Sequence, residues 1–389
     1  MDTERTHALL RLVAAGGRTA PRRRLLEDHP DPATACAAGP EAWRRAGMDA
    51  AQAQALRDGA PGTLDRSVAW LAQPDHHLIG WSDPDYPALL RRIPSPPLAL
   101  FVAGDPALLW HPAVAIVGSR SPSAGGLDNA HGFAHALCRA GFAVTSGLAA
   151  GIDTAAHAAA LGAGGGTVAV LGTGIDVPYP RGNGSLHARI AASGAVVSEH
   201  PPGTGVRREH FPSRNRIIAG LSLGTLVVEA AARSGALITA RLAAESGREV
   251  FAIPGSIHNP KARGCHRLIR DGAALVEDAA ELIEAIAPLA AELGEALRHR
   301  LGDPNSLSGD AGQPAPQVTA PDDPDHQRLW EALGHDPTGM DRLVLRTGLT
   351  AARLSSMLLL MELEGRVAVE HGRYSRKSFH QAPSGAGRG

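Results

Sequence analysis

The sequence lacks any run of 18 uninterrupted apolar residues, so it predicts no membrane-spanning helix. Its first residues, Met1–Arg5, show no basic segment followed by an apolar core, so we expect no signal peptide and a cytoplasmic protein. Cys36, Cys138 and Cys265 are the only cysteines, and they show no Cys-x-x-Cys spacing. This pattern argues against a disulfide framework and a zinc ribbon, and we expect no metal site.

An excess of one charge is also missing, because the chain has 38 basic and 39 acidic residues and a net charge of −1. The field of the whole chain therefore predicts no polyanionic partner, and nucleic-acid binding would require a local patch. Lysine is almost absent: only Lys261 and Lys377 occur, and all other basic residues are arginines. Arginine suits bidentate phosphate contacts, but its abundance alone does not indicate function.

Two nucleotide-binding signatures are missing as well. No Gly-x-x-x-x-Gly-Lys-Ser/Thr segment occurs, which excludes a P-loop. Gly172-Thr-Gly174 begins like a dinucleotide fingerprint but runs into prolines, and Gly118-Ser-Arg120 does not continue as Gly-x-Gly-x-x-Gly. We therefore expect no nucleotide cofactor.

Residues 1–75 contain short helical patterns interrupted by glycine and proline turns. They predict an N-terminal helical module of the SAM or helix-hairpin-helix type. No ionisable cluster in it suggests chemistry, so a packing role is favoured over a DNA contact.

Residues 76–290 alternate short apolar runs with helical patterns. The runs are rich in β-branched residues, and most of them end at Gly, Ser or Pro. They lie at 78–81, 98–102, 113–117, 142–145, 167–171, 195–198, 225–228 and 249–253. Continuous apolar strands separated by helices are typical of a parallel sheet that is covered on both faces. The predicted fold is α/β, with a doubly wound Rossmann-like parallel sheet.

Residues 291–324 are rich in Gly, Pro and Asp and predict a flexible linker. Residues 325–375 predict three helices and a β-wing, which is a winged helix, and 376–389 predict a disordered tail. From 325 to 374 there are seven acidic residues and six arginines, and Glu362 and Glu364 fall on the expected recognition helix. Since a duplex-binding face should be basic, we expect this domain to contact proteins or to modulate binding.

Small, hydroxylated and basic residues follow the predicted strands. Ligands of open parallel sheets bind at the carboxyl ends of the strands, and glycine lets the backbone approach an anion. These residues therefore predict a trough for phosphates: Gly118, Ser119, Arg120, Ser146, Gly147, Gly151, Gly172, Gly174, Arg207, Arg208, Phe211, Arg214, Asn215, Arg216, Ser234, Gly235 and Thr239.

The segment 210–219 is the sharpest part of this pattern. Ser213 is a natural N-cap, which would place Arg214 and Arg216 on the first turn of a helix, where free N–H groups already favour phosphate. The alternative is that Phe211 belongs to the core and that the arginines pair with carboxylates such as Glu199 or Glu229.

Three other polar residues have two interpretations each. Asp153 and His157 are four residues apart on one helix face, and a cap with a packed histidine is favoured over a metal or acid–base site. Glu229 ends a buried strand and either anchors the arginines or acts in catalysis.

Several long motifs occur in order over the same region: Val117-Gly-Ser-Arg120, Ser146-Gly-Leu-Ala-Ala-Gly-Ile-Asp-Thr-Ala-Ala-His157, Phe211-Pro-Ser-Arg-Asn-Arg-Ile217, Ser234-Gly-Ala-Leu-Ile-Thr-Ala240 and Ala252-Ile-Pro-Gly255. In these the chain resembles the bacterial DNA-processing protein A (DprA, also called Smf) family. The resemblance implies a non-enzymatic protein that binds single-stranded DNA without sequence specificity, protects incoming DNA and loads the RecA recombinase in natural transformation and recombination.

The resemblance also implies a homodimer formed through the Rossmann-like domain. It implies a DNA pocket lined by Arg120 and the segment 208–211, with Phe211 stacking on a base. A cationic groove with an aromatic platform is what sequence-independent single-strand binding requires.

Two alternatives remain. One is a nucleotide-monophosphate hydrolase on a related Rossmann-like fold, although Gly224-Thr225 before Glu229 enter a strand rather than a loop and helix. The other is a protein-interaction scaffold with vestigial DNA binding.

Overall fold

The computed structural model describes residues 3–300 without a break and, between 328 and 376, residues 328–330, 332–333, 338–349, 354, 357–358, 361, 367–370 and 373–376. The chain forms two compact units, Met1–Ser308 and Gly309–Gly389. The sheet and the candidate site belong to the first unit.

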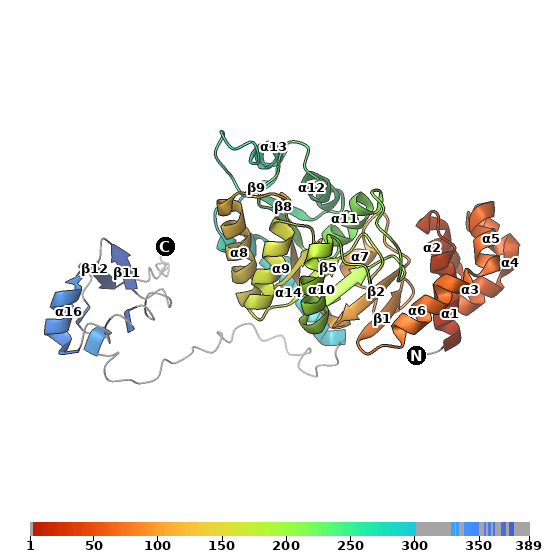
Figure 1. Ribbon diagram of the computed structural model, residues 1–389, viewed down its shortest axis with the longest axis horizontal. Helices are drawn as coiled ribbons and strands as arrows, with labels where there is room; N and C mark the ends of the chain where they lie inside the picture. Colours follow the sequence, from red (N-terminus) through yellow and green to blue (C-terminus); the bar gives the residue numbers. More distant parts are fainter. Residues whose placement is uncertain are drawn as a thin grey trace, which may run out of the picture. The chain divides into compact units, whose positions relative to one another are not determined.

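Six helices begin this unit (Figure 1): α1 (Thr3–Ala14), α2 (Thr19–Asp28), α3 (Pro32–Ala37), α4 (Gly39–Arg45), α5 (Ala50–Asp58) and α6 (Pro61–Leu71). Asp31 and Asp49 cap α3 and α5, since their carboxylates accept from the N–H groups of Thr34 and Gln52 at 3.0 and 2.8 Å. Leu12, Leu25 and Leu56 are buried between these helices. These helices thus share a small apolar cluster, which also includes Leu98 just before the sheet strand that follows.

A sheet of nine strands follows: β1 (His76–Gly80), β2 (Ala99–Gly104), β3 (Ala113–Val117), β4 (Ala143–Ser146), β5 (Thr167–Val170), β6 (Ala195–Ser198), β7 (Gly224–Val227), β8 (Glu249–Ala252) and β9 (Ala274–Leu275). Its order is β1-β2-β6-β5-β4-β3-β7-β8-β9. The strands β3–β9 are mutually parallel, as predicted for a doubly wound sheet.

The sheet is not wholly parallel, which corrects the expectation. Strand β2 runs antiparallel to β6, and β1 runs antiparallel to β2. The connection between β1 and β2 contains only the short helix α7 (Ala88–Arg91), and antiparallel neighbours need no longer crossover.

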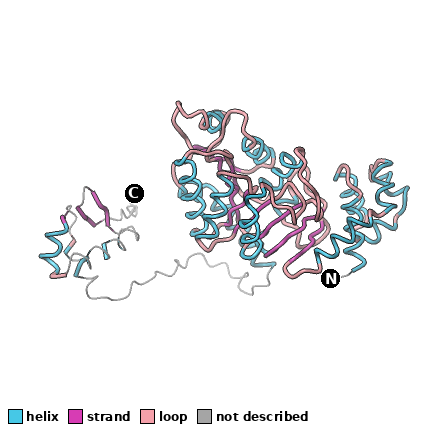
Figure 2. The backbone as a smooth tube through the Cα atoms, in the orientation of Figure 1, coloured by secondary structure: helices cyan, strands magenta, loops and turns pink. Residues whose placement is uncertain are grey.

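Helices cover both faces of the sheet (Figure 2). Helices α8 (Ala124–Arg139), α9 (Ile152–Gly162) and α14 (Ala279–Arg300) pack on the face of Ile116 and Val144. Helices α11 (His210–Gly220), α12 (Ala236–Glu245) and α13 (Arg263–Arg270) pack on the face of Ala115 and Val117. Helix α10 (Gly184–Ser193) packs through Leu186 and Ile190, and η1 (Pro106–Leu109) and η2 (Arg181–Asn183) are short 3-10 turns. Burial on both faces explains why the strands are continuously apolar.

Strand β3 lies where the chain reverses its direction across the sheet. From β3 the chain proceeds to β4, β5 and β6 on one side, and then returns to β7 on the other side of β3. Loops that leave such a point in opposite directions open a crevice at the carboxyl ends of the strands. The fold therefore favours a ligand site beside Val117.

The second unit contains α16 (Met340–Thr347) and a sheet of β10 (Thr338–Gly339), β12 (Arg373–Arg376) and β11 (Val367–Glu370), in that order. Leu354, Met357, Leu358 and Met361 are helical and buried together with Leu343, which agrees with the predicted winged helix. Residues 291–300, the start of the expected linker, belong to α14. The rest of the linker (301–324) and residues 377–389 of the expected tail lie outside the described residues.

In the described ranges of both units, no helix is long and apolar enough to cross a membrane.

Candidate nucleic-acid interface

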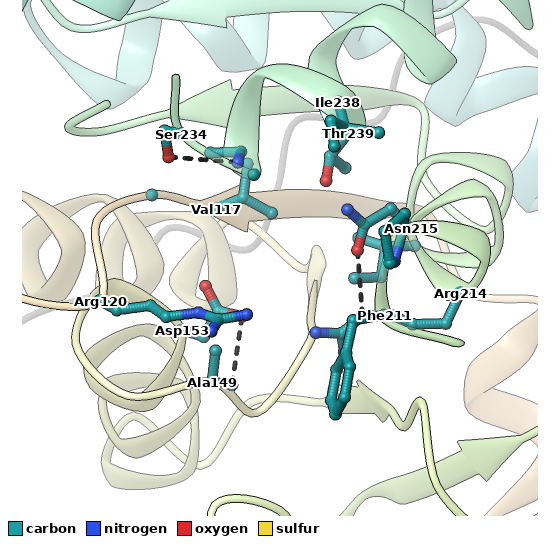
Figure 3. A pocket seen from close by; sticks show the side chains of 15 residues that line it. Val117, Arg120, Ala149, Asp153, Phe211, Arg214, Asn215, Ser234, Ile238 and Thr239 are labelled. Carbon is teal, nitrogen blue, oxygen red and sulfur yellow. Dashed lines mark hydrogen bonds between the residues drawn. The ribbon is translucent and has the colours of Figure 1, made fainter. Parts of the chain in front are cut away.

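Two adjoining hollows lie at the carboxyl edge of the sheet. The larger, of about 400 Å³, is bounded by the loops after β3 and β4 and by the starts of α11 and α12 (Figure 3). The smaller, of about 110 Å³, shares Arg120, Ala149, Phe211 and Arg214 with it. We call the two hollows together the pocket. It lies at the reversal point of the sheet.

Arg120 is exposed and extends along one side of the pocket. It follows Gly118, where a Cβ would lie only 2.7 Å from Cγ1 of Ile152, so the loop can pass this closely only with glycine. The N–H of Ile152 donates to Ser119 O at 3.1 Å and holds the loop against the start of α9. Among the described residues Arg120 has no ion-pair partner within 4.0 Å, so its charge is available to a ligand.

Phe211 faces the pocket from the other side, next to a second ring. The centroids of Phe211 and Tyr179 are 5.1 Å apart. Tyr179 is 39% exposed, and a Cβ at Gly172 would lie 3.2 Å from Cδ1 of Phe211. Tyr179 was not among the predicted site residues, although an aromatic residue in the polar loop after β5 was a signal that could have identified it.

Helix α11 begins earlier than predicted. It starts at His210, Glu209 is the residue before it, and Ser213 is not the N-cap, since its hydroxyl donates to His210 O at 3.2 Å. Pro212 lies inside the first turn, where the backbone nitrogens need no hydrogen-bond partner, so it does not delay the helix. Arg214 and Arg216 therefore lie in the second turn.

Arg214 is buried, and its guanidinium donates to backbone carbonyls. Nη1 donates to Gly147 O at 2.5 Å and to Val170 O, and Nε donates to Oδ1 of Asn215 at 3.0 Å. Burial lowers the pKa of Arg214 to about 10, partly offset by the charge of Asp153, so the group remains charged at neutral pH. Arg214 thus fastens the turn after β4 to the end of β5.

Arg216 forms a bidentate ion pair with Glu199. Nη1 and Nη2 each donate to one carboxylate oxygen at 2.6 Å, and Nε donates to Ser95 O at 2.7 Å. Burial raises the pKa of Glu199, but the hydrogen bonds and charge of Arg216 outweigh burial and lower it overall. The alternative that an arginine of this segment pairs with Glu199 is therefore confirmed for Arg216.

Glu229 does not anchor an arginine: in the described part of the chain it forms no ion pair with one. Its carboxylate accepts from the N–H and the hydroxyl of Ser123 at 2.9 and 2.5 Å, and from Nδ2 of Asn259 at 3.3 Å. Ser123 is the N-cap of α8, so Glu229 stabilises the start of that helix. Gly224 and Thr225 belong to β7, as predicted.

Asp153 and His157 pack inside the protein. Asp153 accepts from the N–H groups of Gly147 and Ala149 at 3.2 and 3.3 Å, and burial raises its pKa against the opposing charge of Arg214. His157 is fully buried, and its Nδ1 lies 2.7 Å from the hydroxyl of Thr167. The predicted packed histidine is confirmed. The predicted cap is not, because the N-cap of α9 is Gly151 and Asp153 bonds to the turn before the helix.

The other predicted residues divide into three groups: those that line the hollows, those that lie elsewhere, and those that support the lining residues. Gly118, Asn215, Ser234, Gly235 and Thr239 line the larger hollow, and Gly147 lines the smaller one. Four residues line neither hollow. Ser146 is buried and donates to Ile116 O at 2.6 Å, and Gly174 packs on the turn 201–204. Arg207 and Arg208 are exposed just before α11. Ser119 and Gly151 shape the loops behind Arg120, and Gly172 supports Phe211.

Across the described residues, no group of three or more His, Cys, Asp or Glu side chains is arranged to hold a metal ion.

The fold and the pocket define a Rossmann-like protein with an arginine and two aromatic rings at the reversal point of its sheet. The family model described as DNA recombination-mediator protein A matches residues 77–287, and the DprA winged helix domain matches residues 313–373. The chain therefore belongs to the DNA recombination-mediator protein A family, which is a family of DNA-processing proteins.

Individual relatives agree. The chain is 40% identical over 338 residues to Protein Smf of Escherichia coli (strain K12), and this alignment covers 86% of each chain. It is 48% identical over 201 residues to the DNA processing protein DprA of Streptococcus pneumoniae, and this alignment covers 52% of this chain and 71% of that one. The crystal structure of Streptococcus pneumoniae DprA aligns with a TM-score of 0.63 and 37% identity over 71% of this chain and 96% of that chain.

Proposed function

We propose that the protein binds single-stranded DNA without sequence specificity in the pocket described above. The observation that carries this proposal is the placement of exposed Arg120 across a hollow from the rings of Phe211 and Tyr179. A cation contacts the phosphate backbone, and an aromatic ring stacks on any base because every base has a π-face. The names of two relatives, DNA processing protein DprA, support DNA as the class of ligand.

The start of α12 adds a second anion contact to the proposed site. Ser234 and Gly235 precede the helix and line the larger hollow, and free N–H groups at a helix start favour phosphate. Arg214 and Arg216 act differently in this proposal. They hold the backbone of the pocket in place, because their donors are engaged by carbonyls and by Glu199.

We further propose that the protein protects incoming DNA and loads the RecA recombinase in natural transformation and recombination, as a homodimer through the Rossmann-like domain. This role would place it in the cytoplasm, beside the recombinase. It requires binding rather than catalysis. A nucleotide-monophosphate hydrolase is the alternative; it would release free base from AMP and lose that activity in Glu229→Gln. The engagement of Glu229 in capping α8 argues against it.

The proposal is tested by the affinity for single-stranded oligonucleotides across a salt series, measured by fluorescence anisotropy. We expect Phe211→Ala to weaken binding by about 1–3 kcal/mol. Arg120→Ala should reduce the slope of log K against log salt by about 0.7, the value for one phosphate contact on a single strand.

Arg139→Ala is the matched control. Arg139 is exposed in the last turn of α8, which leads back to the start of β4 and thus to the opposite edge of the sheet. The Arg139→Ala substitution removes one positive charge, as Arg120→Ala does, and should leave the slope of log K against log salt unchanged. Binding that neither Phe211→Ala nor Arg120→Ala alters would refute the proposed function.

A further inference from the structure

We infer that the single-strand site does not end at the pocket but continues over a second basic surface, the loops that follow β7 and β8. This surface is defined by Arg233, Lys261 and Arg263, and we call it the β7–β8 rim. The inference rests on the proposed function and extends it, because it assigns a second binding segment to the same DNA strand.

The two loops of the rim emerge side by side. Strands β7 and β8 are parallel neighbours, with Val227 opposite Ala252, so both loops leave the same edge of the sheet. Ala230 N–H donates to Lys261 O at 2.7 Å, and Gly264 N–H donates to Ala230 O at 2.7 Å. These two backbone bonds bring the segments that carry Arg233 and Arg263 together in one surface.

The rim is continuous with the pocket. Arg233 immediately precedes Ser234 and Gly235, which line the larger hollow. In Figure 1, α12, which the loop after β7 enters, lies between α11 and α13. A strand whose phosphate contacts Ser234 therefore leaves the pocket directly beside Arg233.

The charge of the rim is not neutralised by the protein. Arg233 and Arg263 are exposed, Lys261 is half-buried, and none of the three forms an ion pair with another described residue within 4.0 Å. One carboxylate, that of Glu229, contacts Asn259 of the loop after β8, and the three cations of the rim outnumber it. On a chain with a net charge of −1, the rim is thus a local cationic surface.

The rim also carries an apolar contact. Ile257, on the loop after β8, is 76% exposed. A nucleic-acid strand presents phosphates for the cations and base faces for an exposed apolar side chain, and this is the combination that the rim can bind. The ligand that fits the rim is therefore single-stranded DNA that passes out of the pocket.

The experiment compares a short oligothymidylate of about 4 nucleotides with a long one of about 16, which span the range of single-strand site sizes known for compact domains. The double variant Arg233→Ala/Arg263→Ala should bind the short oligonucleotide like the wild type. For the long oligonucleotide, the slope of log K against log salt should be smaller by about 1.4 in the double variant. Near 0.1 M salt, each lost phosphate contact should lower the affinity about fivefold. Arg233→Lys/Arg263→Lys should restore most of the slope, because it retains both charges.

The double variant Arg139→Ala/Arg189→Ala is the control, since both of its arginines are exposed, on α8 and α10. An equal loss of salt slope in this control would overturn the proposal of the β7–β8 rim, because the effect would then come from net charge alone. A long oligonucleotide bound equally well by Arg233→Ala/Arg263→Ala and wild type would also overturn it. Arg120→Ala and Phe211→Ala separate the two proposals: if they weaken neither oligonucleotide, the proposed function itself fails.

Discussion

At the scale of single residues, burial separates arginines that look alike in the sequence. Arg120 is exposed beside a hollow, Arg214 is buried against carbonyl oxygens, and Arg216 is paired with Glu199. A buried guanidinium needs all its donors satisfied, whereas an exposed one is free to exchange water for phosphate. The same side chain therefore maintains the fold in two of these positions and is available for binding in the third.

His157 makes stability depend on pH. Burial lowers its pKa to about 3, while an unfolded histidine titrates near 6.5. The unfolded state therefore binds a proton that the folded state does not, and this stability is lost as the pH falls below 6.5. Between pH 7.5 and pH 5 the free energy of unfolding of the wild type should decrease. In His157→Gln this decrease should be smaller by about 2 kcal/mol.

Urea unfolding at several pH values measures this difference. His131→Gln, which replaces an exposed histidine on α8, is the control and should follow the wild type. Parallel curves for His157→Gln and wild type would show that His157 is not held neutral in the fold.

At the scale of elements, the turn between β4 and α9 positions the loop of Arg120. Gly151 has φ of +84°, which favours glycine, and a Cβ there would lie 2.7 Å from Cδ of Pro122 and would collide with Ser119 O. The N–H of Ile152 also donates to Ser119 O. The turn and the loop therefore cannot move independently.

Gly151→Ala should accordingly destabilise the fold by at least about 1–3 kcal/mol and weaken DNA binding, because it displaces the loop that carries Arg120. Thermal unfolding and oligonucleotide binding measure the two effects. Gly162→Ala is the matched control: this residue is helical, nothing lies within 4 Å of its Cβ position, and the change should be neutral or stabilising by up to about 1 kcal/mol. Similar behaviour of the two variants would contradict this account of the turn.

At the scale of the whole molecule, the pocket and the proposed rim lie within the first compact unit. The segment 325–374 adds six arginines and seven acids and thus no net positive charge. A chain that lacks residues 325–389 should therefore keep its affinity for single-stranded DNA to within about tenfold, or 1.4 kcal/mol. Anisotropy titrations of the shortened and full chains measure this, and loss of nearly all binding would show that the winged helix contributes the main contacts.

The sequence by itself determined the features that depend on local pattern. Continuous β-branched runs such as 113–117 became strands buried on both faces, and the periodic residues 354, 357, 358 and 361 became a buried helix face. Glycine and hydroxyl residues after the strands marked the edge where the pocket lies. These patterns are readable because strand and helix periods, and the carboxyl ends of parallel strands, follow from chain geometry alone.

Only the tertiary structure decided which partners meet. Four contacts join segments that are distant in the chain: the pairing of Arg216 with Glu199, the hydrogen bonds of Glu229 to the α8 cap Ser123, the approach of Tyr179 to Phe211, and the antiparallel pairing of β2 with β6. No local pattern encodes them, because burial and the packing of both sheet faces select each partner. The tertiary structure likewise decides that Arg120 is exposed and that no described carboxylate lies within 4.0 Å of its guanidinium.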